Sequence, residues 1–589
     1  MTAVLDIETE SWDKFLIGCL MIDGDVLVTR SETELLDAVL AYDGVIWAHY
    51  GGRFDWLWLL ETLSHREGSK AKIFMSGSSA TCIRIGKTML RDSYRLIPMS
   101  LKKAGGIVGN TKFETGLACV CGTGCGGYCS MRSTMSDDSW ERVRKYLIQD
   151  CRVLNDVIDY VHQFGEDNQI ELRGTVGSTA WATAKKLMDL DNSEWESSEY
   201  SQIATAKYGG RTECARMNAP AIHCYDIHSA YPAALSVLPL PVGPHRLLSR
   251  DNAESAYYDN QPGIWNITIN VPPMHAPPLP WRGKTRLYFP TGTITGTWAR
   301  PEIEHAIKCG CEVISWNWGF VWSIAEKILK TPAEHIWNLR SKYSEINPAL
   351  SKWLKWIANS MTGKFGQDPE TREIVMLIDQ QPPACPGGKC LGFCSPNVCC
   401  DHRCSGRCEA WESIDPLGRI WSRPAWRMSG CAHIEWNIYL TSATRVELHK
   451  QILDAGDNWV YSDTDSVKST RALSRRVGDE LGEWGIEPAG ENWRCIAPKV
   501  YCYETATGPV IRCKGLSRIN QQTWDDYCAG VPVEMNSGVM SLLSAARSGK
   551  SLFTRNAMSR KSVGQDGWCG GRVITNDGFT RAPDISEIE

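Results

Sequence analysis

Residues 459–469 read WVYSDTDSVKS, and the acids at their centre, Asp463 and Asp465, decide the fold predicted for the whole chain. The two acids stand two positions apart about a tight turn, between apolar residues that predict two short strands. A plain hairpin turn is the alternative for DTD taken alone, since Asp and Thr are good turn residues. The choice between the two depends on whether further acids accompany the turn.

A second stretch, CYDIHSAYPAAL (224–235), supplies another acid. Asp226 ends a predicted strand, a turn follows, and a helix is predicted to begin at Tyr231-Pro232. Phosphoryl transfer needs two metal ions that bridge an attacking hydroxyl and a triphosphate, and carboxylates from two strands can hold them. The two acidic stretches together therefore indicate a metal site for phosphoryl transfer.

Between these stretches lies KWIANSMTGKFG (355–366), which predicts a helix. Lys355, Asn359 and Gly363 follow one another at four-residue spacing and fall on one face. A cation on that face could reach phosphates, while the small residues would let a base approach. An amphipathic helix with a solvated lysine is the alternative.

The first residues of the chain carry an independent acidic cluster. AVLDIETE (3–10) predicts a strand in which Asp6 and Glu8 share one face, while Leu5 and Ile7 point into the core. Two oxygen ligands side by side suit the Mg²⁺ pair of a phosphodiester-cleaving site. An edge strand with solvated acids is the alternative for this motif alone.

Two later segments extend this cluster. Phe54-Asp55 ends an apolar segment and adds an acid from a neighbouring element. Tyr146 and Asp150 lie one turn apart in a helix predicted over 138–164, so they meet on one face. The tyrosine could orient an attacking water while the aspartate completes the metal site. Strands followed by this long helix predict an α/β domain that closes near residue 165.

Taken together, DxxSxYP, KxxxNSxxG and YxDTDS resemble motifs A, B and C of the family B DNA polymerases. The resemblance implies that Asp226 and Asp465 are the principal metal ligands and that Asp463 supports them. It also implies a set of nucleotide-binding residues, with Tyr231 under the incoming sugar, Asn359 lining the pocket, and Lys355, Arg340 and Lys352 on the triphosphate. Thr362 stands where the family usually has tyrosine, so the wall that checks the base pair is expected to differ.

The N-terminal acids resemble the DEDDy-type 3′–5′ exonuclease domain of the same family. The resemblance implies that the metal ligands are Asp6, Glu8, Asp55 and Asp150, and that Tyr146 positions the water. It implies contacts to a single strand from Phe54 and Ser93, and a contact to the scissile phosphate from Lys112. Tyr50 stands where the family usually has asparagine, and could stack on a base.

Two more segments indicate the branch of the family. AKYGGRTE (206–213) resembles the YxGG segment between the two activities, which implies DNA contacts by Tyr208, Gly209 and Gly210. APKVYCYE (497–504) resembles the KxY motif, which implies that Lys499 and Tyr501 contact the primer end. The intervals between the three polymerase motifs are long enough for the two insertions of the protein-primed branch.

The resemblance implies a multidomain protein of α/β and α+β domains, with a ribonuclease H-like exonuclease domain and a right-hand polymerase that carries two insertions. The expected boundaries are exonuclease 1–165, first part of the palm 166–240, first insertion or terminal-protein region 241–330, fingers 331–366, Cys-rich second insertion 367–430, second part of the palm 431–520 and thumb 521–589. From the residue pattern, two helices joined around Asn347–Pro348 are predicted over 321–366.

The expected ligands follow from the same resemblance: two Mg²⁺ or Mn²⁺ ions in each site, template and primer DNA, dNTPs, and a terminal protein. The chain is expected to be a monomer or a heterodimer with that protein, in the cytoplasm of the host cell if viral. The formal charge of −5 leaves nucleic-acid binding to local basic surfaces. Neither a signal peptide nor a membrane span is predicted, since the first residues are acidic and no apolar run is long enough.

The 24 cysteines are read as reduced thiols or metal ligands because no secretory signal is predicted. Seven of them fall in the Gly/Pro-rich stretch 382–408, together with His402: Cys385, Cys390, Cys394, Cys399, Cys400, Cys404 and Cys408. A smaller cluster consists of Cys119, Cys121, Cys125 and Cys129. Structural Zn²⁺ and free or redox-paired thiols remain alternatives for both clusters.

The resemblance thus implies a DNA-directed DNA polymerase with a proofreading 3′–5′ exonuclease, primed by a terminal protein. A primer-independent or repair polymerase of the same branch is the alternative within this class. An inactive, polymerase-derived DNA-binding protein is the alternative from another class, and a nuclease whose polymerase half only binds DNA is a third. Unused buried carboxylates are costly to hold together, which favours the active enzyme.

Overall fold

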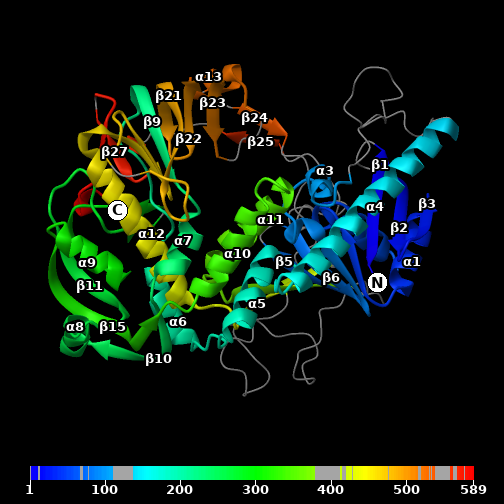
Figure 1. The fold of residues 1–589 in the computed structure, drawn as a ribbon, viewed down its shortest axis with the longest axis horizontal. Coiled ribbons are helices and arrows are strands. Elements are labelled where there is room, and N and C mark those ends of the chain that lie inside the picture. The colour runs from blue at the N-terminus through cyan, green and yellow to red at the C-terminus, as the bar shows by residue number, and fades with distance from the viewer. Residues whose placement is uncertain are drawn as a thin grey trace.

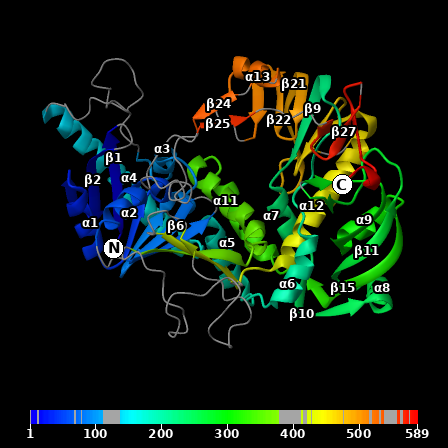
Figure 2. The ribbon, with the colours of Figure 1, turned by 180° about the vertical axis from the view of Figure 1, so that it is seen from behind.

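The computed structural model describes residues 2–10, 14–66, 70–76, 79–110, 137–284, 286–377, 412–413, 420–426, 429–474, 477–514, 519–529, 531, 533–536, 558–561, 567–575 and 577–588. A mixed sheet formed mainly by the N-terminal segment lies at one end of the long axis, and two further sheets lie at the other end (Figure 1). Helices of the middle segment stand between them, as the view from behind also shows (Figure 2). Among the helices in the described ranges, none is both long and apolar enough to cross a membrane.

The N-terminal sheet has ten strands in the order β17-β18-β16-β5-β6-β7-β4-β1-β2-β3. Its strands are β1 (Ala3–Glu10), β2 (Lys14–Ile22), β3 (Asp25–Thr29), β4 (Val45–Ala48), β5 (Lys70–Ser76), β6 (Ser79–Ile85), β7 (Thr88–Asp92), β16 (Glu370–Leu377), β17 (Glu412–Ser413) and β18 (Ile420–Trp426). The last three come from the segment expected as the second insertion, and β16 pairs with β5. The strands at the base of that segment therefore extend the N-terminal sheet.

Helices cover both faces of this sheet, namely α1 (Glu32–Ala41), α2 (Asp55–Leu63) and α4 (Asp137–Asp167), with the short α3 (Leu101–Ala104) beside them. Leu5 and Ile7 of β1 pack with α1 and α2 in one core cluster, whereas Val4 packs with α4 in another. Because side chains alternate along a strand, Asp6 and Glu8 lie on the α4 side of β1. The structure thus confirms that Leu5 and Ile7 are buried in the core.

A second sheet has seven strands in the order β23-β22-β21-β9-β20-β19-β8. Its strands are β8 (Thr212–Cys214), β9 (Asn218–Ile227), β19 (Trp459–Asp463), β20 (Ser466–Ser469), β21 (Trp484–Ala497), β22 (Val500–Thr505) and β23 (Gly508–Cys513). One face packs on α12 (Ile434–Ala455), and the end of β9 leads into α7 (Ala230–Val237). The predicted hairpin at 463–465 and the predicted strand–turn–helix at 226–232 are both present.

A four-stranded sheet in the order β10-β15-β11-β14 follows in the chain. It consists of β10 (Leu240–Ser249), β11 (Gly263–Val271), β14 (Gly292–Ala299) and β15 (Glu312–Glu326), with α8 (Arg250–Tyr258) and α9 (Arg300–Lys308) packed against it and the hairpin β12 (Trp281–Arg282) and β13 (Leu287–Tyr288) nearby. Trp265 and Trp298 are fully buried in its core. These large rings fill the space between the sheet and its helices.

The middle helices are α5 (Val176–Met188), α6 (Ser197–Ile203), α10 (Lys330–Lys342) and α11 (Pro348–Phe365). The predicted junction is correct, because Asn347 caps α11 by accepting a hydrogen bond from Leu350 N (3.0 Å) and Pro348 begins the helix. The prediction was wrong for 321–326. These residues finish β15, which pairs with β10 on one side and β11 on the other and so prolongs an aromatic strand that began at Glu312.

The remaining described elements belong to the C-terminal part: α13 (Gln521–Cys528), β24 (Val533–Asn536), β25 (Met558–Lys561), β26 (Trp568–Cys569), β27 (Arg572–Ile574) and β28 (Thr580–Arg581). Cys569 packs in the same core cluster as residues of β8, β9, β19 and β21. The last strands of the chain therefore lie against the seven-stranded sheet. Lys112, His402 and both predicted cysteine clusters fall outside the described residues.

Candidate active sites

The end of β9 and the turn between β19 and β20 bring the first set of predicted acids together. In the ladder between β9 and β20, Asp226 pairs with Ser466, the residue directly after Asp465. Beyond the ladder, Ile227 N donates to Asp465 O at 2.9 Å. Two sequence segments more than two hundred residues apart therefore place Asp226 and Asp465 at one strand end.

Charge and burial act strongly on these two carboxyl groups. Burial, the nearby Asp465 and then Glu487 raise the pKa of Asp226 to about 7, against the opposing effect of Lys355. Burial, followed by the charge of Asp463, also raises the pKa of Asp465. Two mostly buried carboxylates that repel one another are destabilised as anions, and a divalent cation between them would relieve that repulsion.

Asp463 has a different environment from the other two acids. Lys499 Nζ lies 2.5 Å from its Oδ1 and 2.6 Å from its Oδ2. Thr212 and Thr464 also donate to Oδ1, at 2.9 and 3.2 Å. The acid predicted to support the metal ligands is thus held by the lysine of the predicted KxY motif, which joins that motif to the DTD turn.

Three of the predicted nucleotide-binding residues, Tyr231 on α7, Arg340 on α10 and Lys355 on α11, lie near the acid pair or the turn beside it. Lys355 lowers the pKa of both Asp226 and Asp465, which shows that it lies within electrostatic reach. Arg340 Nη1 donates to Ser229 Oγ at 2.6 Å, in the turn after β9. Asp465 likewise contributes, after burial, to the raised pKa of Tyr231.

The exposed face of α11 matches its prediction in part. Lys355 and Gly363 are exposed and Asn359 is half-buried, so the three residues border one accessible face. A Cβ on Gly363 would meet no atom within 4 Å. Lys352 is on the same helix, but its Nζ lies over the Trp356 ring, 5.4 Å from the centroid, and not in a contact with the acid pair.

Thr362 faces inward, unlike the tyrosine implied by the family pattern. It is 3% exposed, and Asn437 Nδ2 of α12 donates to its carbonyl oxygen at 2.9 Å. Its hydroxyl is buried without a hydrogen-bond partner among the described residues. At this position α11 therefore contacts α12 and not an accessible pocket.

Three charged residues near the acids were not singled out from the sequence. Lys468 is 3% exposed on β20, its Nζ lies over the rings of Tyr501 and Tyr503, and it lowers the pKa of Asp226. Glu487 on β21 raises that pKa. The strand positions of Lys468 and Glu487 could have indicated that both lie near Asp226. Both residues pair with Cys224, which is two residues before Asp226 on the same face of β9.

The third missed residue is Arg445 on α12, which organises the YGG segment. Arg445 is 2% exposed, and its Nη1 donates to the carbonyl oxygens of Tyr208 and Gly209, each at 3.0 Å. The Tyr208 ring is itself buried in the core of the four-stranded sheet. The backbone of the two glycines, and not that ring, is the accessible part of this segment.

The N-terminal acids meet at the ends of β1, β7 and α2. Asp55 is 1% exposed at the start of α2, and its Oδ1 accepts a hydrogen bond from Ile7 N at 3.0 Å. Burial holds the pKa of Asp55 well above its usual range, with the charges of Asp92 and Glu8 adding to that effect. Glu8, Asp55 and Asp92 therefore share one electrostatic neighbourhood.

Helix α4 delivers the last members of this group. Tyr146 and Asp150 lie one turn apart, and the helix packs on β1 and β2. A hydrogen bond with Cys19, then burial, raises the pKa of Cys151, and the charges of Asp6 and Asp150 both add to it. The strand acid Asp6 and the helix acid Asp150 thus both lie within electrostatic reach of one buried thiol.

Aromatic rings border this second site. The Tyr50 and Tyr94 rings stack at 4.0 Å between centroids, and Tyr50 is 36% exposed. His49 lies edge-on to both rings. Ser93 is fully buried. Its hydroxyl donates to Ala48 O at 3.2 Å and contacts His49 Nδ1 at 3.0 Å, so Ser93 contacts the aromatic group through His49. Phe54, half-buried, directly precedes Asp55 at the start of α2.

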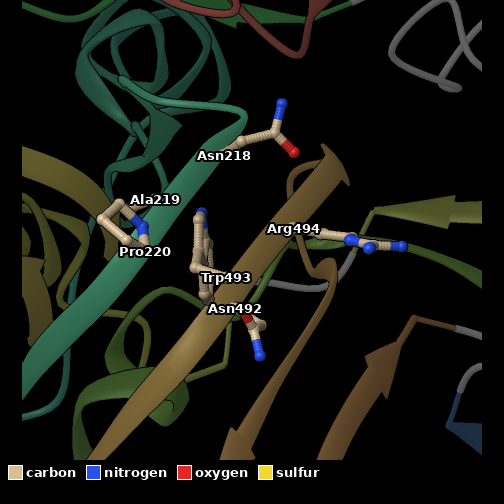
Figure 3. Close-up of a pocket in the computed structure, with 6 residues that line it drawn as sticks. All are labelled: Asn218, Ala219, Pro220, Asn492, Trp493 and Arg494. Carbon is tan, nitrogen blue, oxygen red and sulfur yellow. The ribbon is translucent and has the colours of Figure 1, made fainter.

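A shallow pocket of about 250 Å³ lies between β9 and β21, at the end far from the acids (Figure 3). It is lined by Asn218, Ala219, Pro220, Asn492, Trp493 and Arg494. Asn218 and Asp226 are at opposite ends of β9, roughly 26 Å apart at about 3.3 Å per residue. This pocket is therefore separate from the acid pair.

Comparison with known proteins finds similarity to DNA polymerases. A family model described as DNA polymerase type B, organellar and viral, matches residues 131–385. The DNA-directed DNA polymerase of Enterobacteria phage PRD1 is 23% identical over 488 residues, which cover 81% of this chain and 76% of that protein. A probable DNA polymerase of Neurospora intermedia is 22% identical over 404 residues, covering 64% of this chain and 39% of the relative.

The fold has counterparts among solved structures. Phi29 DNA polymerase, complexed with primer-template DNA and incoming nucleotide substrates, matches with a TM-score of 0.70 at 14% identity, covering 96% of this chain and all of that one. The same polymerase complexed with single-stranded DNA matches with a TM-score of 0.69 at 13% identity, over 96% of this chain. The chain is thus similar to type B DNA polymerases of the organellar and viral kind over residues 131–385, to a phage DNA polymerase over most of its length, and in its fold to phi29 DNA polymerase.

Proposed function

We propose that this chain is a DNA-directed DNA polymerase that extends a primer strand at Asp226 and Asp465 and removes nucleotides from a 3′ end at a second, separate site. The observation that carries the proposal is the convergence of Asp226 and Asp465, linked by the hydrogen bond from Ile227 N to Asp465 O. The phage relative named as a DNA-directed DNA polymerase supports the same activity.

Family B DNA polymerases use divalent metal ions, and the residues of this site fit such ions. Asp226 and Asp465 offer hard oxygen donors, and the raised pKa of each carboxyl shows negative charge held at a cost that a bound cation would offset. We assign two Mg²⁺ ions to each site. When bound, they would stabilise the charge that develops on the phosphate oxygens and on the attacking hydroxyl.

The chain's own residues would orient the nucleotide around this pair. Lys355 and Arg340, on α11 and α10, are the cations assigned to the triphosphate, and Lys352 is a more remote third. Tyr231 would lie under the incoming sugar, and Asn359 would line the base pocket. Lys499 and Tyr501 would meet the primer end beside the DTD turn, with Gly209 and Gly210 admitting the strand.

The second site would use Asp6, Glu8, Asp55 and Asp150 as metal ligands and Tyr146 to position a water. The shared neighbourhood of Glu8, Asp55 and Asp92 supports this assignment. The exposed Tyr50 ring, stacked on Tyr94, offers a surface on which a 3′-terminal base could stack. We propose that this site degrades DNA from the 3′ end and that this degradation serves proofreading.

We extend the proposal to domains and priming. The ten-stranded sheet and its helices correspond to the exonuclease domain, the seven-stranded sheet to the palm, and α10 and α11 to the fingers. The four-stranded sheet occupies the interval assigned to the first insertion, where a terminal protein carrying the priming hydroxyl would bind. Similarity to a phage polymerase supports action in the cytoplasm of a host cell.

Two substitutions test whether the sites are separate. Asp465→Asn should abolish primer extension with dNTPs and Mg²⁺ while single-stranded DNA is still degraded. Asp6→Ala should remove degradation while extension continues. Loss of both activities in either variant, with an unchanged melting temperature, would contradict two independent sites.

Priming has its own test. On a linear template without a primer and without a terminal protein, the purified chain should yield no product, whereas a primed template is copied. Product formation on the unprimed template would favour the primer-independent alternative and leave the assignment of the polymerase site intact.

A further inference from the structure

Three buried cysteines from distant parts of the chain converge on one point of the seven-stranded sheet. Cys214 ends β8, Cys495 lies near the end of β21, and Cys569 ends β26. Their sulfur atoms all lie within 4.8 Å of one another. The exposed fractions of the three residues are 0%, 4% and 0%. None of the sequence motifs includes these thiols.

A buried cation lies beside the thiol cluster. Arg572 of β27 is the strand partner of Cys569 in β26. Arg572 is fully buried and also donates to His275 O and to Thr580. A fixed cation beside three sulfurs can balance the net negative charge of a dication bound by three thiolates.

We propose that Cys214, Cys495 and Cys569 bind a structural Zn²⁺ ion that fastens the C-terminal strands to the seven-stranded sheet. Thiolates prefer zinc to the hard Mg²⁺ of the acidic sites. With Zn–S bonds of about 2.3 Å, tetrahedral geometry places sulfurs about 3.8 Å apart. The three sulfurs lie within 4.8 Å of one another, so none of these separations exceeds that value by more than about 1 Å. Arg216 O, 3.1 Å from Cys214 Sγ, lies where an oxygen could complete the coordination.

A second convergence of metal-binding side chains, His305, Cys309 and His449, has a simpler explanation. His449 Nε2 donates to Ala276 O at 2.8 Å, which leaves its Nδ1 as an acceptor. His305 Nε2 lies 2.7 Å from that Nδ1 and donates to it. These two rings satisfy one another without an ion, whereas the three thiols donate weak hydrogen bonds to backbone carbonyl oxygens, at 3.1, 3.4 and 3.8 Å.

The location of the thiol cluster connects it to the polymerase site. Thr212, two residues before Cys214, donates to Asp463. Lys499, four residues after Cys495, binds the same carboxylate. An ion that joins β8, β21 and β26 would therefore hold both partners of Asp463 in register without touching a substrate.

Zinc content in matched variants tests the proposal. The full chain, purified under reducing conditions, is compared with Cys569→Ser and with Cys431→Ser, which alters a buried cysteine outside the cluster. Inductively coupled plasma mass spectrometry should show about one zinc per chain less in Cys569→Ser than in both wild type and Cys431→Ser. The difference, not the total, is the readout, because any zinc held by other cysteines is common to all three proteins. Equal zinc in the two variants would overturn the proposal.

A measurement on the unaltered chain decides the case if Cys569→Ser fails to fold. Crystals of the wild-type protein grown without added zinc should show an anomalous scattering peak between the three sulfurs at the zinc absorption edge, which disappears below the edge. Three thiols without such a peak, or a disulfide between any two of them, would overturn the proposal.

Discussion

Lys499 binds Asp463 through both carboxylate oxygens, with its Nζ 2.5 Å from Oδ1 and 2.6 Å from Oδ2. The lysine backbone has φ +65°, a left-handed conformation that non-glycine residues rarely adopt, and its N–H donates to the Tyr461 hydroxyl at 2.9 Å. The backbone is thus strained at Lys499, the residue whose ammonium group binds Asp463. The negative charge of Asp463 is thereby balanced beside the pair Asp226 and Asp465.

Replacing Lys499 with methionine should therefore act on Asp465. The Lys499 charge opposes the rise in the pKa of Asp465 that burial and Asp463 produce, so its loss should raise that pKa further. The acidic limb of the rate–pH profile for single-nucleotide incorporation should move to higher pH, with a rate loss of about tenfold per pK unit on that limb. Lys499→Arg keeps the charge and serves as the control. A slower variant with an unmoved profile would contradict this role.

The raised pKa of Asp226 predicts a pH-dependent stability of the metal-free protein. The folded-state pKa of about 7 lies above the ordinary value of 3.8, so between these values the folded state holds a proton that the unfolded state has released. Stability from this group is therefore lost as pH rises through that window. Asp226→Asn should be more stable than wild type in EDTA near neutral pH, by about 1–2 kcal/mol after allowance for solvent screening, and should lose this advantage below the unfolded pKa.

Thermal melts in EDTA at a series of pH values measure this difference. Added Mg²⁺ should then raise the melting temperature of wild type more than that of Asp226→Asn, because a neutral side-chain amide is a poor substitute for a carboxylate ligand. A difference in melting temperature that does not change with pH would show that Asp226 is not the titrating group.

Gly210 and Gly209 form a matched pair at the YGG segment. A Cβ on Gly210 would lie 2.6 Å from Thr464 Oγ1 and 2.8 Å from its Cγ2, whereas a Cβ on Gly209 would meet nothing within 4 Å. Gly210→Ala should therefore displace the turn that carries Asp463 and Asp465, destabilise the free protein by about 1–3 kcal/mol and slow extension. Gly209→Ala should melt like wild type. Equal melting temperatures for the two variants would contradict the close approach.

The pairing of distant acids could be predicted because each motif carries its own local geometry. Asp463 and Asp465 define a hairpin, and Asp226 ends a strand before a helix, so the fold had only to bring two strand ends together. Lys499 was predicted to meet the primer, but its contact with Asp463 depends on the registration of β21 with β22 and on a left-handed backbone. Neither feature is visible in a run of residue types.

Long-range packing accounts for the rest. The segment 321–326 was predicted to be helical because the mostly apolar run VWSIAE is compatible with either a buried helix or a buried strand. Only its pairing with β10 and β11 shows that it is a strand. Cys214, Cys495 and Cys569 have no common spacing, so their meeting depends on how the C-terminal strands return to the sheet. The role of Arg445 could likewise not be predicted, because the sequence shows an arginine in a long helix but not the groups that it contacts in the fold.

Arg445 and Glu302 form a buried ion pair whose loss should be costly. Both are 2% exposed, and Arg445 Nε and Nη2 donate to Glu302 Oε1 and Oε2 at 2.7 and 3.0 Å. Arg445→Met would leave Glu302 as a buried, uncompensated charge and should destabilise the protein by about 3–5 kcal/mol. Adding Glu302→Gln should recover part of that loss, because the remaining group is neutral. Chemical denaturation of wild type, both single variants and the double variant gives the coupling energy, and strictly additive effects would contradict the pair.

The double variant, although more stable than Arg445→Met, still lacks the guanidinium that donates to Tyr208 O and Gly209 O. Its transfer of a primer end between extension and degradation should therefore remain altered.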